Sequence, residues 1–203
     1  MDAGQKNGLL VIDGKGKMPD WAYPWGTMRE GIKTVFISNG VTRIGDYAFL
    51  SCKSLTQIEI PDSVTSIGKS AFAHCSSLSG INIPDGVTTI GEYAFDNCTS
   101  MTDISIPGGV TRIERGTFND CSSLTSIDIP KGVTVIGYQA FVRCTSLTQI
   151  TIPNSVVKFK SFLGLNETFF GCTSLKSVYM PRCLNRMLFE TYYGIPKDIV
   201  TFT

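Results

Sequence analysis

The stretch TQIEIPDSVTSIGKSAFAHCSSL, residues 56–78, decides the fold because close copies of it follow one another along the chain. The copies repeat every 23 residues up to residue 147, and the next copy is five residues longer. Cysteine marks one place in each copy: Cys52, Cys75, Cys98, Cys121, Cys144 and Cys172. A period of this length predicts a solenoid, in which each unit buries its apolar side only by stacking on its neighbours.

Each copy contains two segments of alternating apolar and polar residues, which predict short strands. In residues 56–78 the first segment centres on Ile58 and ends at Pro61, because proline cannot donate to a β ladder. The second segment covers residues 64–67 and ends at a glycine. Residues 70–75 follow with apolar side chains at helical spacing, which predicts one helical or 3-10 turn.

Stacking places equivalent residues of successive coils above one another. One predicted internal ladder is Ile58, Ile81, Ile104, Ile127 and Ile150, and another is Phe72, Phe95, Phe118 and Phe141. The six repeating cysteines point the same way rather than toward one another, so we expect small, buried, reduced residues and no disulfides. Cys183 lies outside the repeat and is expected to be a freer thiol.

Composition excludes several classes of function. The 203 residues suffice for one domain, and 42% are apolar and 17% charged. A net charge of +1 gives no electrostatic reason to expect a nucleic acid or an anionic membrane as partner. No apolar run approaches the length of a bilayer span, so we expect no membrane insertion. No secretory signal is visible, and we interpret this as a signal that has been removed.

Residues with reactive side chains form no recognisable catalytic or metal-binding motif. The single histidine, His74, precedes Cys75, but adjacent residues on a helical turn point about 100° apart. Its counterparts in other coils are Asn97, Asp120 and Arg143, which is typical of a solvated surface position. Zinc, calcium and phosphate-loop patterns are missing. We therefore expect no metal, no cofactor and no enzyme activity.

The segment LTSIDIPKGV, residues 124–133, resembles the strand of leucine-rich repeats, with isoleucine in place of leucine. The rest of the unit, V-T-x-I-G-x-x-A-F-x-x-C-x-S-L, resembles the BspA-like subfamily over about residues 30–180. Residues 8–20 resemble the capping hairpin at the N-terminus of that family. The resemblance implies an α/β solenoid: a right-handed superhelix with a parallel β-sheet on its concave face, short strands and 3-10 or helical turns on its convex face, and a cap at each end.

One structural domain is expected, in three parts. These are an N-terminal cap at residues 1–32, six leucine-rich repeats at 33–175 and a C-terminal cap at 176–203. Trp21 and Trp25 are expected to cover the first end, and the aromatic-rich residues 187–193 the other. Residues 14–17 are interpreted as a hairpin turn, and residues 199–202 as a last strand.

Two features depart from the repeat. Five extra residues lie between Phe159 and Phe169 and are expected on the outer face, where Phe162 and Leu163 either fold back on the cap or form an exposed apolar patch. A discontinuous aromatic series stands beside the glycine of each turn: Tyr47, Tyr93 and Tyr138. These rings are interpreted either as half-buried packing or as an outer-face site.

The remaining candidate site is the outward side of the first strand, which is the expected concave face. Its predicted binding residues are Phe36, Gln57, Glu59, Asn82, Asp103, Ser105, Asp128, Gln149, Thr151 and Tyr179. The middle of this face is small, polar and mildly acidic, and aromatic residues stand only at its two ends. Leucine-rich repeats commonly bind partners there, although polar residues would also be needed for simple solvation of a sheet.

The leading functional hypothesis is a non-enzymatic protein-binding or adhesion module, located extracellularly or on a bacterial cell surface. Its expected partner is a host or matrix protein, and we expect the module itself to be a monomer. One alternative is a structural spacer within a larger surface protein. Another is a glycan-acting enzyme using Asp103 and Asp128, diagonal neighbours about 7–8 Å apart, but no cleft is evident around them.

Overall fold

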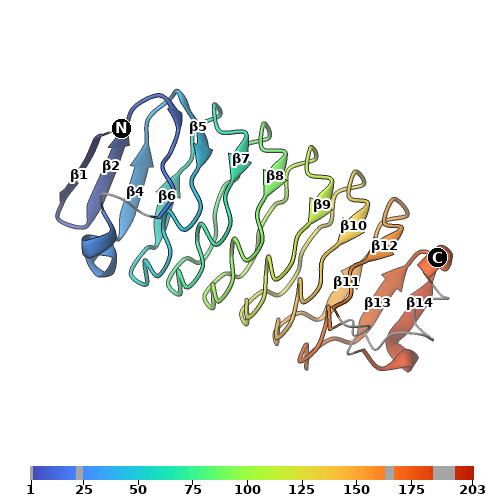
Figure 1. Ribbon diagram of the computed structural model, residues 1–203. Coiled ribbons are helices and arrows are strands. Elements are labelled where there is room, and N and C mark those ends of the chain that lie inside the picture. Colours follow the sequence, from blue (N-terminus) through green and yellow to red (C-terminus); the bar gives the residue numbers. More distant parts are fainter. Residues whose placement is uncertain (1, 22–24, 163–166, 185–194) are drawn as a thin grey trace.

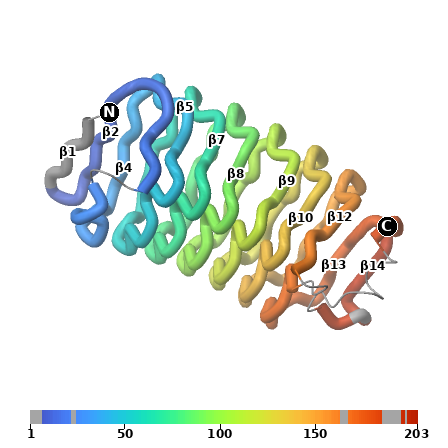
Figure 2. Tube along the Cα trace, in the orientation of Figure 1, coloured from blue at the N-terminus to red at the C-terminus, as the bar shows by residue number. Residues whose placement is uncertain are grey.

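The computed structural model describes residues 2–21, 25–162, 167–184 and 195–203, and it shows an elongated solenoid of stacked coils (Figure 1). The two ends of the chain lie at opposite ends of the stack, and the coils follow one another in sequence order (Figure 2). Backbone hydrogen bonds join each coil to its neighbours. The predicted solenoid is confirmed.

Each coil contributes to two walls. The first wall holds the segment before the proline of each repeat, together with the terminal strands that pair with it. Its strands are β1 (Asp2–Lys6), β2 (Leu9–Asp13), β4 (Thr34–Ile37), β6 (Gln57–Glu59), β11 (Gln149–Thr151), β13 (Ser177–Met180) and β14 (Val200–Phe202). The second wall holds the segment after the proline. Its strands are β3 (Gly16–Lys17), β5 (Val41–Ile44), β7 (Ser66–Ile67), β8 (Thr89–Ile90), β9 (Arg112–Ile113), β10 (Val135–Ile136) and β12 (Lys158–Phe159).

Hydrogen-bonded pairing on the first wall is interrupted. Strands β2, β4 and β6 pair in parallel at one end, and β11, β13 and β14 do so at the other. In the described coils between them, one isolated bridge joins Ser105 to Asp128. The expectation of one parallel sheet through all coils is therefore wrong for the middle of this wall.

The spacing of the interior rings does not follow the interruption. The rings of Phe49, Phe72, Phe95, Phe118 and Phe141 stack with centroids 5.3 to 5.8 Å apart. Phe141 and Phe169 stack at 5.6 Å in the coils where β11 and β13 remain paired. The second wall is paired more regularly, in the orders β3-β5-β7-β8 and β9-β10-β12.

The corner after the second wall is a series of turns and not the predicted helical or 3-10 turn. Two residues in a typical coil have positive φ, for example Ser70 (φ 49°) and His74 (φ 61°), and a right-handed helix excludes them. Amide groups there bond to the next coil, as when the Phe72 N–H donates to the Ala94 carbonyl oxygen at 2.8 Å. Among the described residues, helix is confined to three short 3-10 segments: η1 (Gly26–Gly31), η2 (Arg182–Leu184) and η3 (Lys197–Ile199).

The interior consists of the predicted ladders. The aromatic stack is fully buried from Phe49 to Phe169, and Trp25 continues it at the N-terminal end, 5.9 Å from Phe49. Trp21, the other ring expected there, is 68% exposed and stacks on Tyr47 instead. The isoleucine ladder is buried with one exception, Ile81, which is only partly buried.

The N-terminal hairpin turns at a different place from the one predicted. Antiparallel β1 and β2 are joined at Asn7 and Gly8, whose φ values of 52° and 83° suit an Asn-Gly hairpin turn. Residues 14–17 are not a hairpin turn, because Gly16 and Lys17 form β3 and pair in parallel with β5. The predicted last strand begins at Val200, since Ile199 ends η3. The aromatic-rich residues 187–193 and Leu163 lie outside the described residues.

Candidate functional site

The outward side chains of the first wall form two columns, which we call the polar face. The first column is Thr34, Gln57, Gly80, Asp103, Ser126, Gln149 and Ser177, and the second is Phe36, Glu59, Asn82, Ser105, Asp128, Thr151 and Tyr179. Residues alternate along a strand, so burial of Ile58 on β6 turns Gln57 and Glu59 outward. All ten predicted binding residues are exposed.

Strand register brings some of these residues together and keeps others apart. Phe36 is directly beside Glu59, Ser105 is beside Asp128, and Thr151 is beside Tyr179. Gln149 neighbours Ser177 in the other column. The two aromatic residues, Phe36 (43% exposed) and Tyr179 (39% exposed), stand at opposite ends of the face, as predicted.

The polar face carries uncompensated negative charge. Its acidic residues are Glu59, Asp103 and Asp128, and its two columns contain no lysine or arginine. Among the described residues none of these three carboxylates takes part in an ion pair. The Asp103 carboxylate accepts one hydrogen bond, from the Thr102 hydroxyl at 3.1 Å. Exposed charges without partners favour cationic ligands.

Two hollows open where the pairing of the first wall is interrupted. One, of about 380 Å³, lies between β6 and residues 80–82, where Gly80 contributes no side chain. The other, of about 610 Å³, is lined by Asp128, Lys131, Thr151 and Asn154. The face is therefore recessed at two places and is not a flat sheet.

The alternative of a glycan-acting enzyme is not supported by these hollows. Asp128 lines the larger hollow, but Asp103 lines neither of the two. A glycosidase needs two carboxyl groups facing one another across a cleft. The polar face offers no such pair.

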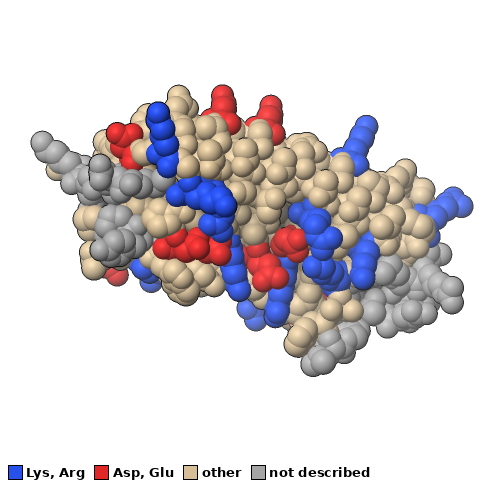
Figure 3. All heavy atoms as spheres, turned by 45° about the horizontal axis from the view of Figure 1, so that its top comes forward, with Lys and Arg blue, Asp and Glu red and all other residues tan. Residues whose placement is uncertain are grey.

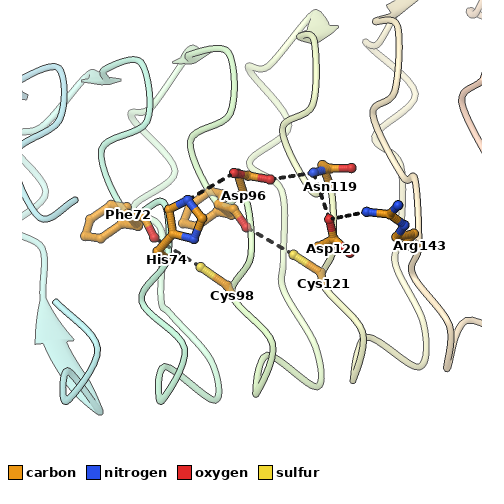
Figure 4. Close-up of polar contacts among 9 residues, drawn as sticks. Phe72, His74, Asp96, Cys98, Asn119, Asp120, Cys121 and Arg143 are labelled. Carbon is orange, nitrogen blue, oxygen red and sulfur yellow. Dashed lines mark hydrogen bonds and ion pairs between the residues drawn. The ribbon is translucent and has the colours of Figure 1, made fainter. Parts of the chain in front are cut away.

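His74 and the buried cysteines also form no nucleophilic site (Figure 4). The His74 Nε2 atom faces the Asp96 carboxylate of the next coil, 3.7 Å away. The Cys98 sulfur instead lies 3.2 Å from the Phe72 carbonyl oxygen, and burial raises the pKa of this thiol well above its usual value. A catalytic thiol needs the reverse, a lowered pKa and an adjacent base.

A chain of polar contacts continues from Asp96 across the outer corner (Figure 4). Asn119 donates to Asp96 at 2.6 Å and to Asp120 at 3.2 Å, and Arg143 pairs with Asp120 at 3.4 Å. Burial raises the pKa of the Asp96 carboxyl, against the lowering effects of Asn119 and His74. In the part of the chain that the structure describes, no three His, Cys, Asp or Glu side chains are grouped to hold a metal ion.

Two features of the outer corner were not found from the sequence. The sequence indicates a solvated surface position for His74, Asn97, Asp120 and Arg143, but all four residues also have positive φ. Its enrichment in Asn, Asp and His was a signal of the left-handed region. The tyrosine series is also not one column: Tyr47 and Tyr93 share the left-handed position, whereas Tyr138 lies one residue earlier in its coil, where Arg115 stands in the coil before.

The stacked coils, the isoleucine and phenylalanine ladders and the open polar face define a leucine-rich-repeat solenoid. The model of the family described as "BspA type Leucine rich repeat region (6 copies)" matches residues 28–148 and 99–202. The chain therefore belongs to the BspA-type leucine-rich-repeat family. This family and fold are those of repeat proteins that are generally non-enzymatic.

Solved structures with a similar fold include bacterial leucine-rich-repeat proteins. The chain is similar to a leucine-rich-repeat protein from T. pallidum, with a TM-score of 0.73, 27% identity and coverage of 96% of each chain. A leucine-rich-repeat protein from Eubacterium ventriosum gives a TM-score of 0.52 at 23% identity, covering 89% of this chain and 79% of the other, and shows likeness of fold alone. A search of curated proteins gives no match. None of the helices among the described residues has the length and apolar character to cross a membrane.

Proposed function

We propose that this chain is a non-enzymatic protein-binding module of a bacterial cell-surface or secreted protein, and that it holds its partner on the polar face. The observation that carries the proposal is the row of exposed carboxylates of Glu59, Asp103 and Asp128, which have no ion pair among the described residues and stand in two outward columns without lysine or arginine. If these side chains served only to keep the wall hydrated, lysine and arginine would be as suitable as aspartate and glutamate.

The geometry supports an extended contact with a cationic protein segment. The three carboxylates are spread over several coils, and the two hollows of about 380 Å³ and 610 Å³ give a partner's side chains places to enter. Phe36 and Tyr179 add apolar area at the two ends of the face. Aromatic side chains of this kind are enriched at protein interfaces. The expectations of an extracellular host or matrix partner, of a monomeric module and of terminal caps belong to the same proposal.

The competing function is a spacer that only holds other domains apart. A pull-down from host extracellular proteins separates the two, using the wild-type chain and a variant with Glu59→Lys, Asp103→Lys and Asp128→Lys. A control variant changes net charge equally at exposed acidic residues outside the polar face: Glu30→Lys, Asp62→Lys and Asp85→Lys. Capture by the wild type and the control but not by the polar-face variant supports binding. Equal capture by all three chains contradicts the polar-face site, and no capture by any chain favours the spacer.

A further inference from the structure

Charged residues gather in a band along one side of the solenoid, with positive and negative groups side by side (Figure 3). Near the second wall, most of the lysine and arginine side chains that the structure describes have a carboxylate partner. Lys69 pairs with Glu92 at 3.8 Å, and Arg112 and Lys160 share Glu114 at 2.8 and 3.4 Å. Arg115, in the same region, has no ion pair with any described residue.

Three aromatic rings surround the Arg115 guanidinium. Its central carbon lies 5.6 Å from the ring centroid of Tyr93, 5.4 Å from that of Tyr138 and 5.4 Å from that of Phe162. The rings come from three coils, and Phe162 belongs to the five-residue insertion. Phe162 also packs on Tyr138 at 5.8 Å and remains 51% exposed. The rings therefore hold the guanidinium in place without neutralising it.

Neighbouring residues hold the rings themselves. The Tyr138 hydroxyl donates to Glu167 at 2.9 Å, and Gln139 donates to the same carboxylate oxygen at 2.8 Å. Gly116 makes room for Tyr93, because a Cβ atom there would come within 2.2 Å of the Tyr93 ring. The cluster is thus built before any ligand arrives, which lowers the entropy lost on binding.

The guanidinium of Arg115 has no polar partner among the described residues. Its Nε atom is buried without a hydrogen-bond partner, and it is the one such side-chain atom in the described part of the chain. Arg115 as a whole is only half-buried. A guanidinium fork that is held by rings and has no partner in the described ranges matches a carboxylate in geometry and in charge.

The surroundings have the complementary sign for an acidic partner. Arg112 and Lys160 share one carboxylate, so their group retains a positive charge, and Lys158 is exposed on β12 without an ion pair among the described residues. The Glu167 carboxylate beside Tyr138 offsets one positive charge, but together with Arg115 the cations still outnumber the carboxylates. We propose that Arg115, Tyr93, Tyr138 and Phe162 form a second binding site, which receives a carboxylate side chain from an acidic segment of a partner protein. This site is separate from the acidic polar face and does not depend on it.

The test uses the ¹⁵N-labelled chain and follows the side-chain Nε–Hε signal of Arg115 by NMR. The probes are the peptide acetyl-Glu-Leu-Glu-Leu-Glu-amide, its glutamine counterpart and sodium sulfate. The acidic peptide is expected to shift the Arg115 signal in a saturable way, and the glutamine peptide is not. The proposal would be overturned by equal shifts with both peptides or by no shift with the acidic peptide. Shifts with sulfate alone would also overturn it, because they would assign the site to small oxyanions.

Matched variants separate a specific site from general attraction. Arg115→Gln should weaken binding of the acidic peptide at least tenfold, on the order expected for loss of a charged hydrogen bond. Arg143→Gln removes the same charge from a side chain that is 62% exposed and paired with Asp120, and should leave the affinity unchanged. Equal losses in both variants would overturn the proposal. If Arg115→Gln fails to fold, the test uses Phe162→Ala, at an exposed residue. This variant should bind the acidic peptide more weakly, and an unchanged affinity would overturn the proposal.

Discussion

The sulfur of Cys98 lies 3.2 Å from the carbonyl oxygen of Phe72, one coil earlier (Figure 4). The same contact joins Cys75 to Phe49, Cys121 to Phe95 and Cys144 to Phe118, each at 3.2 Å. The Phe72 carbonyl oxygen accepts two hydrogen bonds, one from the backbone N–H of Cys75 and a second from the thiol of Cys98. The periodic cysteine is therefore a packing residue that also links adjacent coils.

Replacing this thiol should weaken the fold moderately. Cys98→Ala removes the weak S–H donor and a buried sulfur, so we expect a loss of about 1–2 kcal/mol in the free energy of unfolding. Urea denaturation measures it. Cys183→Ala, at an exposed residue, is the control and should change stability little. An equal loss in the two variants would contradict the role given to Cys98.

Thiol reagents should distinguish the cysteines in the folded chain. All seven are free: Cys52 to Cys144 are buried, Cys172 is half-buried and Cys183 is exposed. Burial raises the pKa of the Cys52 thiol to about 12, which leaves almost no thiolate at neutral pH. We expect Cys183 to react first because it is exposed. Cys172 should react next, ahead of the buried five, because it is only half-buried and a hydrogen bond with Cys144 lowers its pKa. Mass spectrometry of the labelled chain checks the order, and rapid labelling of Cys98 would refute it.

Truncation of a ring in the aromatic stack should be far more costly. Phe95→Ala removes a fully buried ring that stacks on Phe72 at 5.5 Å and on Phe118 at 5.8 Å. The expected loss is about 3–5 kcal/mol, from lost burial and the cavity left behind. Phe36→Ala removes a ring that is 43% exposed and serves as the control, with a much smaller loss. Thermal unfolding of both variants tests whether the stack stabilises the solenoid.

The Asp96 carboxylate should lower stability at neutral pH. Burial raises the pKa of Asp96 in the folded chain above its ordinary value, so the folded state binds this proton more readily than the unfolded state. Protonation therefore stabilises the fold as the pH falls through that pKa. Asp96→Asn keeps an oxygen to accept from Asn119, and we expect it to gain about 1 kcal/mol or less at pH 7.

The gain from Asp96→Asn should shrink as the pH falls, because the wild-type carboxyl then loses its charge as well. Urea denaturation at neutral and at acidic pH measures the difference between the two chains. A variant that is less stable than the wild type at pH 7 would show that the contact of Asp96 with His74 outweighs its burial.

The repeat spacing predicts the interior because it fixes which residues coincide from coil to coil. The Phe95 stack, the cysteine ladder and the outward position of Glu59 all follow from it. The interruption beside β6 does not, since the neighbouring coils repeat the same sequence pattern whether or not their strands pair. The turn at Asn7 has a strong local signal, since an Asn-Gly pair is typical of a hairpin, and it lies before the segment for which the sequence predicts the turn.

The Arg115 cluster could not be predicted from one repeat, since it combines an arginine with rings from three other coils, and one of these rings belongs to the insertion. Only the three-dimensional stack brings Phe162 beside Tyr138. Gly116, which stands where the preceding coil has Tyr93, was a trace of this cluster in the sequence. The reason for glycine at this position is the Tyr93 ring of the preceding coil, so a single repeat does not show it.

Binding by the polar face is tested by hydrogen–deuterium exchange of the chain, alone and with a protein captured in the pull-down. We predict slower exchange in the presence of that protein at Gln57–Glu59, at residues 80–82, 103–105 and 126–128, and at Gln149–Thr151. Slower exchange confined to the second wall, or unchanged exchange throughout the first wall, would contradict the proposed binding face.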